Sequence, residues 1–190
     1  CFADEPDPDG IRTRSLSFGA GGRLGERLTV ELRSMLTDGS SEFDGSFTNE
    51  VEIAQRVTSL QFSAPLGNWR AQALFGWNED VQDNFHDGVD SDRYRSRRRS
   101  ASVQADGVIG GLQALVGADY HNDRIASTLP FEGDSRDTAG VFAELRRSFG
   151  AWSLMGGARL EDNQQYGSNH THNLGLAHRF NGGQRITLTW

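Results

Sequence analysis

Two short acidic segments that each end in glycine are the first candidates for chemistry in this sequence. Residues 7–10 read Asp-Pro-Asp-Gly, and Asp38 and Asp44 belong to a second segment that ends at Gly45. Carboxylates two residues apart before a glycine form part of the pattern of an oxygen-ligand calcium loop. The rest of the twelve-residue pattern is missing, so spacing alone favours acidic turns, although the two segments could share an ion.

The second candidate is an arginine-rich run at residues 93–99, which reads Arg-Tyr-Arg-Ser-Arg-Arg-Arg. In a strand, Arg97 and Arg99 share a face with Ala101 and Val103, while Arg98 points to the opposite face. Guanidinium groups bind phosphate oxygens in a bidentate manner, so Arg97 and Arg99 are candidate contacts for anionic lipopolysaccharide. A solvated strand end remains the alternative.

No arrangement of catalytic residues is recognisable. The sequence has no nucleophile elbow and no glycine loop that would cradle a phosphate. Its single cysteine, Cys1, allows no internal disulfide and no cysteine-rich metal site. A net charge of −7 without a basic stripe argues against a nucleic-acid partner. We therefore expect neither an enzyme nor an organic cofactor, since a hydrolase would need Ser and His to converge on one face.

The elements that must position these residues are strands, because apolar and polar side chains alternate along most of the 190 residues. No apolar run approaches the roughly 20 residues that a membrane-spanning helix needs. The mean hydropathy of −0.57 does not exclude a barrel wall, which is apolar on one face only. The alternation predicts ten strands, at 11–20, 23–37, 50–64, 68–79, 93–106, 111–123, 136–149, 151–162, 169–180 and 184–190.

The breaks between these segments are of two alternating kinds. Short glycine-rich breaks predict tight hairpin turns, and long acidic connections separate them. Short turns on one rim and long loops on the other are typical of outer-membrane barrels. The tight turns are expected at Gly21-Gly22, 65–68, 107–111, 149–151 and 181–183, and the long loops at 38–50, 78–92, 122–137 and 161–169.

A soluble sandwich would also alternate, and two features favour a membrane barrel over it. Trp69 and Trp77 lie eight residues apart on one face, roughly 26 Å along a strand and about 20 Å along the membrane normal after tilt, which suits the two aromatic girdles of a membrane barrel. Charged residues such as Glu31 and Arg33 on the opposite face suit a wide polar lumen. The sequence therefore predicts an all-β, antiparallel transmembrane barrel segment of about ten strands.

Several segments resemble TonB-dependent outer-membrane receptors of the vitamin B12 branch, in the same order as in that family. The resemblance implies a barrel of about 22 strands with an N-terminal plug, in the outer membrane of a Gram-negative bacterium. It implies import of cobalamin or a similar scarce metal chelate, energised by the TonB complex through the plug. Calcium-ordered loops in some relatives make Asp7 and Asp9 candidate ligands, with Asp38 and Asp44 as weaker ones. The segments that carry the resemblance are 38–45, 83–85, 93–94, 135–142, 157–167, 173–176 and 179–180.

The sequence departs from that family in having no TonB box, no plug and no closing strand. We therefore expect residues 1–190 to form a partial receptor barrel domain. A siderophore receptor of the same architecture is an open alternative, because substrate specificity resides in plug and loop surfaces. A small ten-stranded passive pore or structural barrel is a further alternative, but its first and last strands would have to pair.

Overall fold

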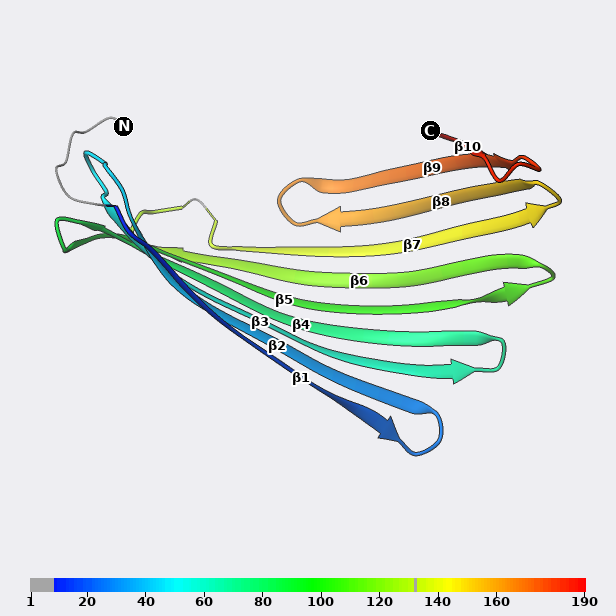
Figure 1. Cartoon of the computed structure of the whole chain (residues 1–190), viewed down its shortest axis with the longest axis horizontal. Coiled ribbons are helices and arrows are strands. Elements are labelled where there is room, and N and C mark those ends of the chain that lie inside the picture. The colour runs from blue at the N-terminus through cyan, green and yellow to red at the C-terminus, as the bar shows by residue number, and fades with distance from the viewer. Residues whose placement is uncertain (1–8, 132) are drawn as a thin grey trace.

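The computed structural model describes residues 9–131 and 133–190, and these residues form one antiparallel sheet of ten strands in chain order. Figure 1 shows the strands side by side, with β1 and β10 at the two edges. The predicted count and the antiparallel fold are confirmed. The strands are β1 (Ile11–Leu24), β2 (Leu28–Glu42), β3 (Glu50–Leu66), β4 (Trp69–His86), β5 (Val89–Ile109), β6 (Leu112–Ser127), β7 (Ser135–Phe149), β8 (Trp152–Asn163), β9 (Gly167–Arg179) and β10 (Arg185–Thr189).

The sheet is open across the residues that the structure describes, because β1 pairs only with β2 and β10 only with β9. A closed ten-stranded barrel would require β1 and β10 to pair. That alternative is therefore wrong for this chain as described. Within the same ranges, no helix is long and apolar enough to cross a membrane.

The connections at one end of the sheet are shorter than the sequence predicts. The connection expected at 78–92 is only a two-residue turn, because β4 and β5 continue to Asp87-Gly88. Both turn residues have positive φ, 51° for Asp87 and 74° for Gly88, the geometry that matches the twist of a tight hairpin. The expected loops at 38–50, 122–137 and 161–169 likewise shrink to 43–49, 128–134 and 164–166.

These loop predictions were wrong because the strands extend past the apolar segment. A strand surrounded by water on both faces needs no apolar alternation, so its acidic sequence looks like a loop. At the other end, the turn expected at Gly21-Gly22 lies at residues 25–27, where Gly25 has a φ of 66°. We call the end with residues 43–49, 87–88, 128–134 and 164–166 the loop side, and the opposite end the turn side.

The strand register separates the sheet into an apolar outer face and a polar inner face. Phe75 pairs with Ala101, Ala101 with Tyr120, and Tyr120 with Ala139, so apolar residues are neighbours on the same face. The apolar belt covers about nine residues per strand, the length that a tilted strand needs to cross a bilayer. Its members include Trp69, Ala71, Ala73, Phe75 and Trp77 on β4, Leu112, Ala114, Val116, Ala118 and Tyr120 on β6, and Trp152, Leu154, Ala158 and Leu160 on β8.

Trp69, at the turn-side edge of this belt, can cover its partner residue because that residue is a glycine. Trp69 pairs with Gly107, and a Cβ added at Gly107 would lie 2.5 Å from the indole Cδ2. Only glycine leaves the backbone open for the ring to cover. Gly107 is therefore part of β5, whereas the tight turn that it was expected to join lies at Gly110-Gly111.

Candidate functional site

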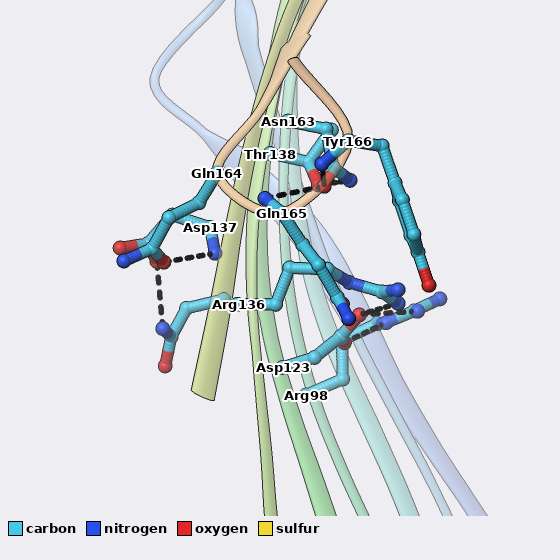
Figure 2. Close-up of polar contacts among 10 residues, drawn as sticks. Arg98, Asp123, Arg136, Asp137, Thr138, Asn163, Gln164, Gln165 and Tyr166 are labelled. Atoms are coloured by element: carbon cyan, nitrogen blue, oxygen red, sulfur yellow. Dashed lines mark hydrogen bonds and ion pairs between the residues drawn. The ribbon is translucent and has the colours of Figure 1, made fainter. Parts of the chain in front are cut away.

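The candidate site is a cluster of charged and aromatic side chains on the inner face near the loop side. It combines Arg98 of β5, Asp123 of β6, Arg136 of β7 and Tyr166 of the β8–β9 turn, and we call it the loop-side cluster. Figure 2 shows both arginines reaching the Asp123 carboxylate, with Tyr166 beside them. The register makes these strand residues direct neighbours, since Arg98 pairs with Asp123 and Asp123 with Arg136.

Asp123 is the centre of the cluster because it accepts hydrogen bonds from two guanidinium groups. Arg98 binds it in a bidentate manner, with distances of 2.5 Å from Nε to Oδ1 and 2.8 Å from Nη2 to Oδ2. Arg136 donates from Nη2 to Oδ2 at 3.0 Å. These two arginines and one carboxylate carry a local excess of one positive charge, which favours an anionic group of a ligand at this point.

The β8–β9 turn that carries Tyr166 is fixed by the Asn163 side chain. Its Oδ1 accepts hydrogen bonds from the backbone amides of Gln165 and Tyr166, at 3.0 and 3.1 Å. Its Nδ2 donates to Thr138 Oγ1 at 2.8 Å, and Thr138 is only 2% exposed. An Asn side chain that caps its own turn replaces missing backbone partners, so Asn163 and Thr138 together hold this turn on β7.

Tyr166 then lies within reach of Arg136, whose Cζ is 5.9 Å from the centre of the phenol ring. Gln164 strengthens the attachment, because its backbone amide donates to the Asp137 carbonyl at 2.9 Å while its side chain accepts from the Asp137 amide. A guanidinium at this distance from an aromatic face is attracted by the ring quadrupole. The Tyr166 ring and the Arg136 guanidinium are therefore held next to each other before any ligand binds.

Three members of the cluster, Arg98, Asp123 and Arg136, line a concavity of about 890 Å³. Amide side chains share its lining with the charged groups and supply both donors and acceptors. A chelate with carboxylate, phosphate or catecholate groups and a polar periphery fits such a lining. The lining of the concavity includes Gln55, Asn78, Arg98, Asp123, Arg136 and Gln165, and also the acidic residues Asp80 and Asp134.

A second ionic group, the mid-wall triad, lies on the inner face at the level of the apolar belt. Arg159 binds Asp119 through both Nη atoms, at 2.5 and 2.8 Å, and binds Glu161 Oε2 at 2.8 Å. Its guanidinium also lies 6.0 Å from the Phe142 ring centre. Gly140 pairs with Asp119 and with Glu161, and a Cβ there would clash with the Arg159 guanidinium, so glycine makes room for it.

Three of the four aspartates predicted as calcium ligands lie in the described ranges, and Asp7 lies outside them. Asp38 pairs with Arg14, four positions along β2 from Glu42, whose amide donates to the carbonyl of Gly10 next to Asp9. Within the described ranges, no group of three or more His, Cys, Asp or Glu residues could hold a metal. Asp9, Asp38 and Asp44 are thus not assembled into one site, and calcium binding stays a prediction.

The two predicted girdle residues do share the outer face. Trp69 lies at the turn-side edge of the apolar belt, and Trp77 pairs with Arg99 near the loop-side edge. Trp152 and Tyr120 occupy similar places on β8 and β6. Location at the two membrane interfaces stays a prediction for Trp69 and Trp77.

The predicted lipopolysaccharide contacts, Arg97 and Arg99, also lie on the outer face, on the opposite side of β5 from Arg98. Arg97 donates from Nε to Glu79 Oε1 at 3.1 Å, and Arg95 binds the same carboxylate oxygen. Sequence reasoning therefore found the direction of these side chains but missed Glu79. It also missed the loop-side cluster. The one available signal was the alternation along the strand, which places Arg98 on the inner face.

The ionisation of Asp123 leads to a prediction about acid stability. Asp123 lies beyond Tyr120, the last outward aromatic residue of β6, and so outside the membrane-spanning part. Hydrogen bonds from Arg98, with a smaller contribution from Arg136, outweigh desolvation and lower the pKa of Asp123 to about 2. Because this pKa is lowered on folding, the carboxylate stabilises the folded state fully above its unfolded pKa of about 4 and loses that effect as the pH falls toward 2.

We expect the difference in unfolding free energy between the natural protein and Asp123→Asn to be constant from pH 7 to about pH 5. It should shrink steadily between about pH 4 and pH 2. Urea unfolding of both proteins at a series of pH values measures this difference. A difference that already disappears near pH 5 would show that the two arginines do not hold Asp123 in its ionised form.

An open antiparallel wall with an apolar belt outside and ionic clusters inside defines a section of an outer-membrane type of β-barrel. Residues 4–190 match the family described as TonB dependent receptor-like, beta-barrel, and the chain belongs to this family. This family of receptors and transporters also bears out the expectation that the protein is not an enzyme.

A vitamin B12 transporter BtuB from Photobacterium profundum is 23% identical over 188 residues, which cover 96% of this chain and 31% of that protein. Among solved structures, a ferric enterobactin receptor (PfeA) variant from Pseudomonas aeruginosa matches with a TM-score of 0.79 and 13% identity, over 90% of this chain and 31% of that one. The siderophore receptor PirA from the same organism matches with a TM-score of 0.78 and 11% identity, over 90% and 31%. The chain thus spans about a third of these relatives, and the two structures establish the fold alone.

Proposed function

We propose that this chain is the wall section of an outer-membrane receptor that imports vitamin B12 or a similar scarce metal chelate in a Gram-negative bacterium. The observation that carries the proposal is the 23% identity to a vitamin B12 transporter along 96% of the chain. The energy for import would come from the TonB complex, acting through a plug domain that these residues do not include. Calcium bound by loop carboxylates would order the loop side before the ligand arrives.

The ligand would first meet the loop-side cluster. The cluster lies at the loop end of the inner face, where an incoming molecule leaves bulk water and enters the lumen. Amide groups such as Gln55 and Gln165 would bind the polar periphery of a large chelate, since amides both donate and accept hydrogen bonds. A turn anchored by Asn163 and Thr138 would lose little entropy on binding.

A second candidate, import of an anionic ferric siderophore, is favoured by one specific observation. Arg98 and Arg136 share the Asp123 carboxylate, which leaves one local positive charge at these three residues, while Asp80 and Asp134 line the same concavity farther along. A local positive charge attracts an anionic group of a chelate and would contribute little to binding a chelate without net negative charge. The charge of the preferred ligand therefore distinguishes the two candidates.

The decisive experiment measures binding of radiolabelled cyanocobalamin to the full-length receptor, with and without calcium. We expect saturable binding that becomes tighter when calcium is present. Competition with an excess of an anionic ferric chelate belongs in the same experiment, because displacement would support the second candidate. Absence of cyanocobalamin binding in both conditions would remove the vitamin B12 proposal and leave the barrel wall intact.

A matched pair of variants tests whether an anionic chelate binds at the loop-side cluster. We expect Arg136→Gln to weaken binding of an anionic chelate by about tenfold, since one charge-assisted hydrogen-bond donor is lost. Arg33→Gln removes the same charge from the inner face on β2 and should change affinity by less than about twofold. Equal effects of the two variants would contradict a specific role for the loop-side cluster.

A further inference from the structure

Five arginines gather on the outer face at the loop-side edge of the apolar belt, and we call them the outer arginine patch. We propose that this patch binds the phosphate groups of lipopolysaccharide in the outer leaflet. All five side chains are exposed. One comes from β3, on one side of β4, and the other four come from β5 and β6, on the other side. The members are Arg56, Arg95, Arg97, Arg99 and Arg124.

The strand register assembles the patch from distant parts of the sequence. Arg56 of β3 pairs with Glu79 of β4, Glu79 pairs with Arg97 of β5, and Arg97 pairs with Arg124 of β6. These side chains therefore form a lateral row across the sheet, with neighbouring strands roughly 4.8 Å apart. Arg95 and Arg99 lie above and below Arg97 on the same face of β5.

The charge of the patch is strongly positive despite the acid inside it. Glu79 binds Arg95 and Arg97, with 3.1 Å between Arg97 Nε and the carboxylate, and this neutralises one of the five positive charges. Two further outward acids lie near the patch and have other partners: Asp83 binds Arg93 at 3.0 Å, and Asp137 accepts hydrogen bonds from Tyr120 and Asn122. Several guanidinium groups therefore remain available to phosphate, which they bind better than a point charge does because of their planar fork of donors.

The location selects a lipid phosphate over a soluble anion. Trp77, Ala101 and Tyr120 continue the same outer face directly toward the turn side, so a group bound at the patch would have its acyl chains against the apolar belt. The opposite edge of the belt differs, because in the described strands Arg147 is the one outward arginine near the turns. This asymmetry matches a membrane whose two leaflets carry different amounts of phosphate.

The test measures binding of lipid A with two phosphates to the delipidated full-length protein, for example by native mass spectrometry. We expect the combined variant Arg97→Gln, Arg99→Gln and Arg124→Gln to weaken binding by about tenfold or more, because at least two charge-assisted contacts are lost. Lipid A with one phosphate should bind more weakly than the two-phosphate form. Unchanged binding in the triple variant would overturn the proposal.

Controls separate the patch from general charge effects and from free phosphate. A second triple variant, Arg33→Gln, Arg70→Gln and Arg146→Gln, removes the same charge from the inner face and should change binding by less than about twofold. Glu79→Gln should strengthen binding, because it releases Arg95 and Arg97. Equal losses in the two triple variants, or full displacement of lipid A by an equal concentration of inorganic phosphate, would contradict a lipid-phosphate site. Heat-induced unfolding of each variant confirms that it is folded.

Discussion

Arg159→Ala should lower the free energy of unfolding by about 2 kcal/mol, because it removes the shared partner of two carboxylates in the mid-wall triad. Arg159 holds Asp119 and Glu161 together, and the side chains are 30%, 24% and 36% exposed. Removing one partner of a fully buried ion pair costs roughly 3 to 5 kcal/mol. Partial exposure reduces this cost, since water screens the two remaining acids.

The chain provides matched controls for this substitution. Arg159→Lys keeps the charge but cannot bind Asp119 in a bidentate manner while it also binds Glu161, so its effect should be intermediate. Arg70→Ala removes an exposed inner-face arginine near the turn side and should cost less than about 0.5 kcal/mol. Urea unfolding of the full-length protein in lipid vesicles measures all three. A loss for Arg159→Ala no larger than that for Arg70→Ala would show that the triad does not stabilise the wall.

The wall itself could be predicted because alternation has a fixed period. On β4 the residues from Trp69 to Trp77 are apolar at every odd position, and a pleated strand places these on one face. The glycine-rich breaks predict the positions of most of the tight turns on the turn side. The period alone therefore gives the strand count, the two faces and the side of each arginine in the run at 93–99.

The extent of the strands on the loop side could not be predicted for the same reason. Beyond Trp77, β4 continues to His86 through polar and acidic residues, since no lipid selects apolar side chains there. The turn at Asp87-Gly88 contains a recognisable dipeptide, but it lies inside a region that reads as an acidic loop. The Asp-Gly pair, which is favoured in two-residue hairpin turns, thus predicts this connection better than the acidic composition of the region does.

The loop-side cluster could not be found from the sequence because it depends on register. Parity places Arg98 on the inner face but does not say which residue of β6 lies opposite. A shift of the pairing by two residues would keep every face and would replace Asp123 by His121 or Ile125. The capping of the β8–β9 turn by Asn163 adds Tyr166, a contact that no spacing rule specifies.

The inner and outer arginine clusters together suggest a division of tasks within one short region. Arg98 faces the lumen and the proposed ligand, while its neighbours Arg97 and Arg99 face the proposed lipid phosphates. Because successive strand residues alternate, a single arginine-rich run serves both surfaces. A substitution in this run should therefore affect either ligand binding or lipid binding, according to its parity.

Two adjacent positions on β5 test most directly whether the apolar face meets lipid and the polar face meets the lumen. Val103 lies in the middle of the outer belt, paired with Ala73, and Ser102 lies beside it on the inner face. Arginine in contact with the bilayer midplane destabilises a membrane barrel by about 2–4 kcal/mol, whereas arginine in a polar lumen is tolerated.

The measurement is the unfolding free energy of Val103→Arg and Ser102→Arg in the full-length protein, folded into lipid vesicles and unfolded by urea. We expect Val103→Arg to be less stable by about 2–4 kcal/mol and Ser102→Arg to lose less than about 1 kcal/mol. Similar losses for the two variants, or a larger loss for Ser102→Arg, would contradict the assignment of the faces and with it the barrel wall.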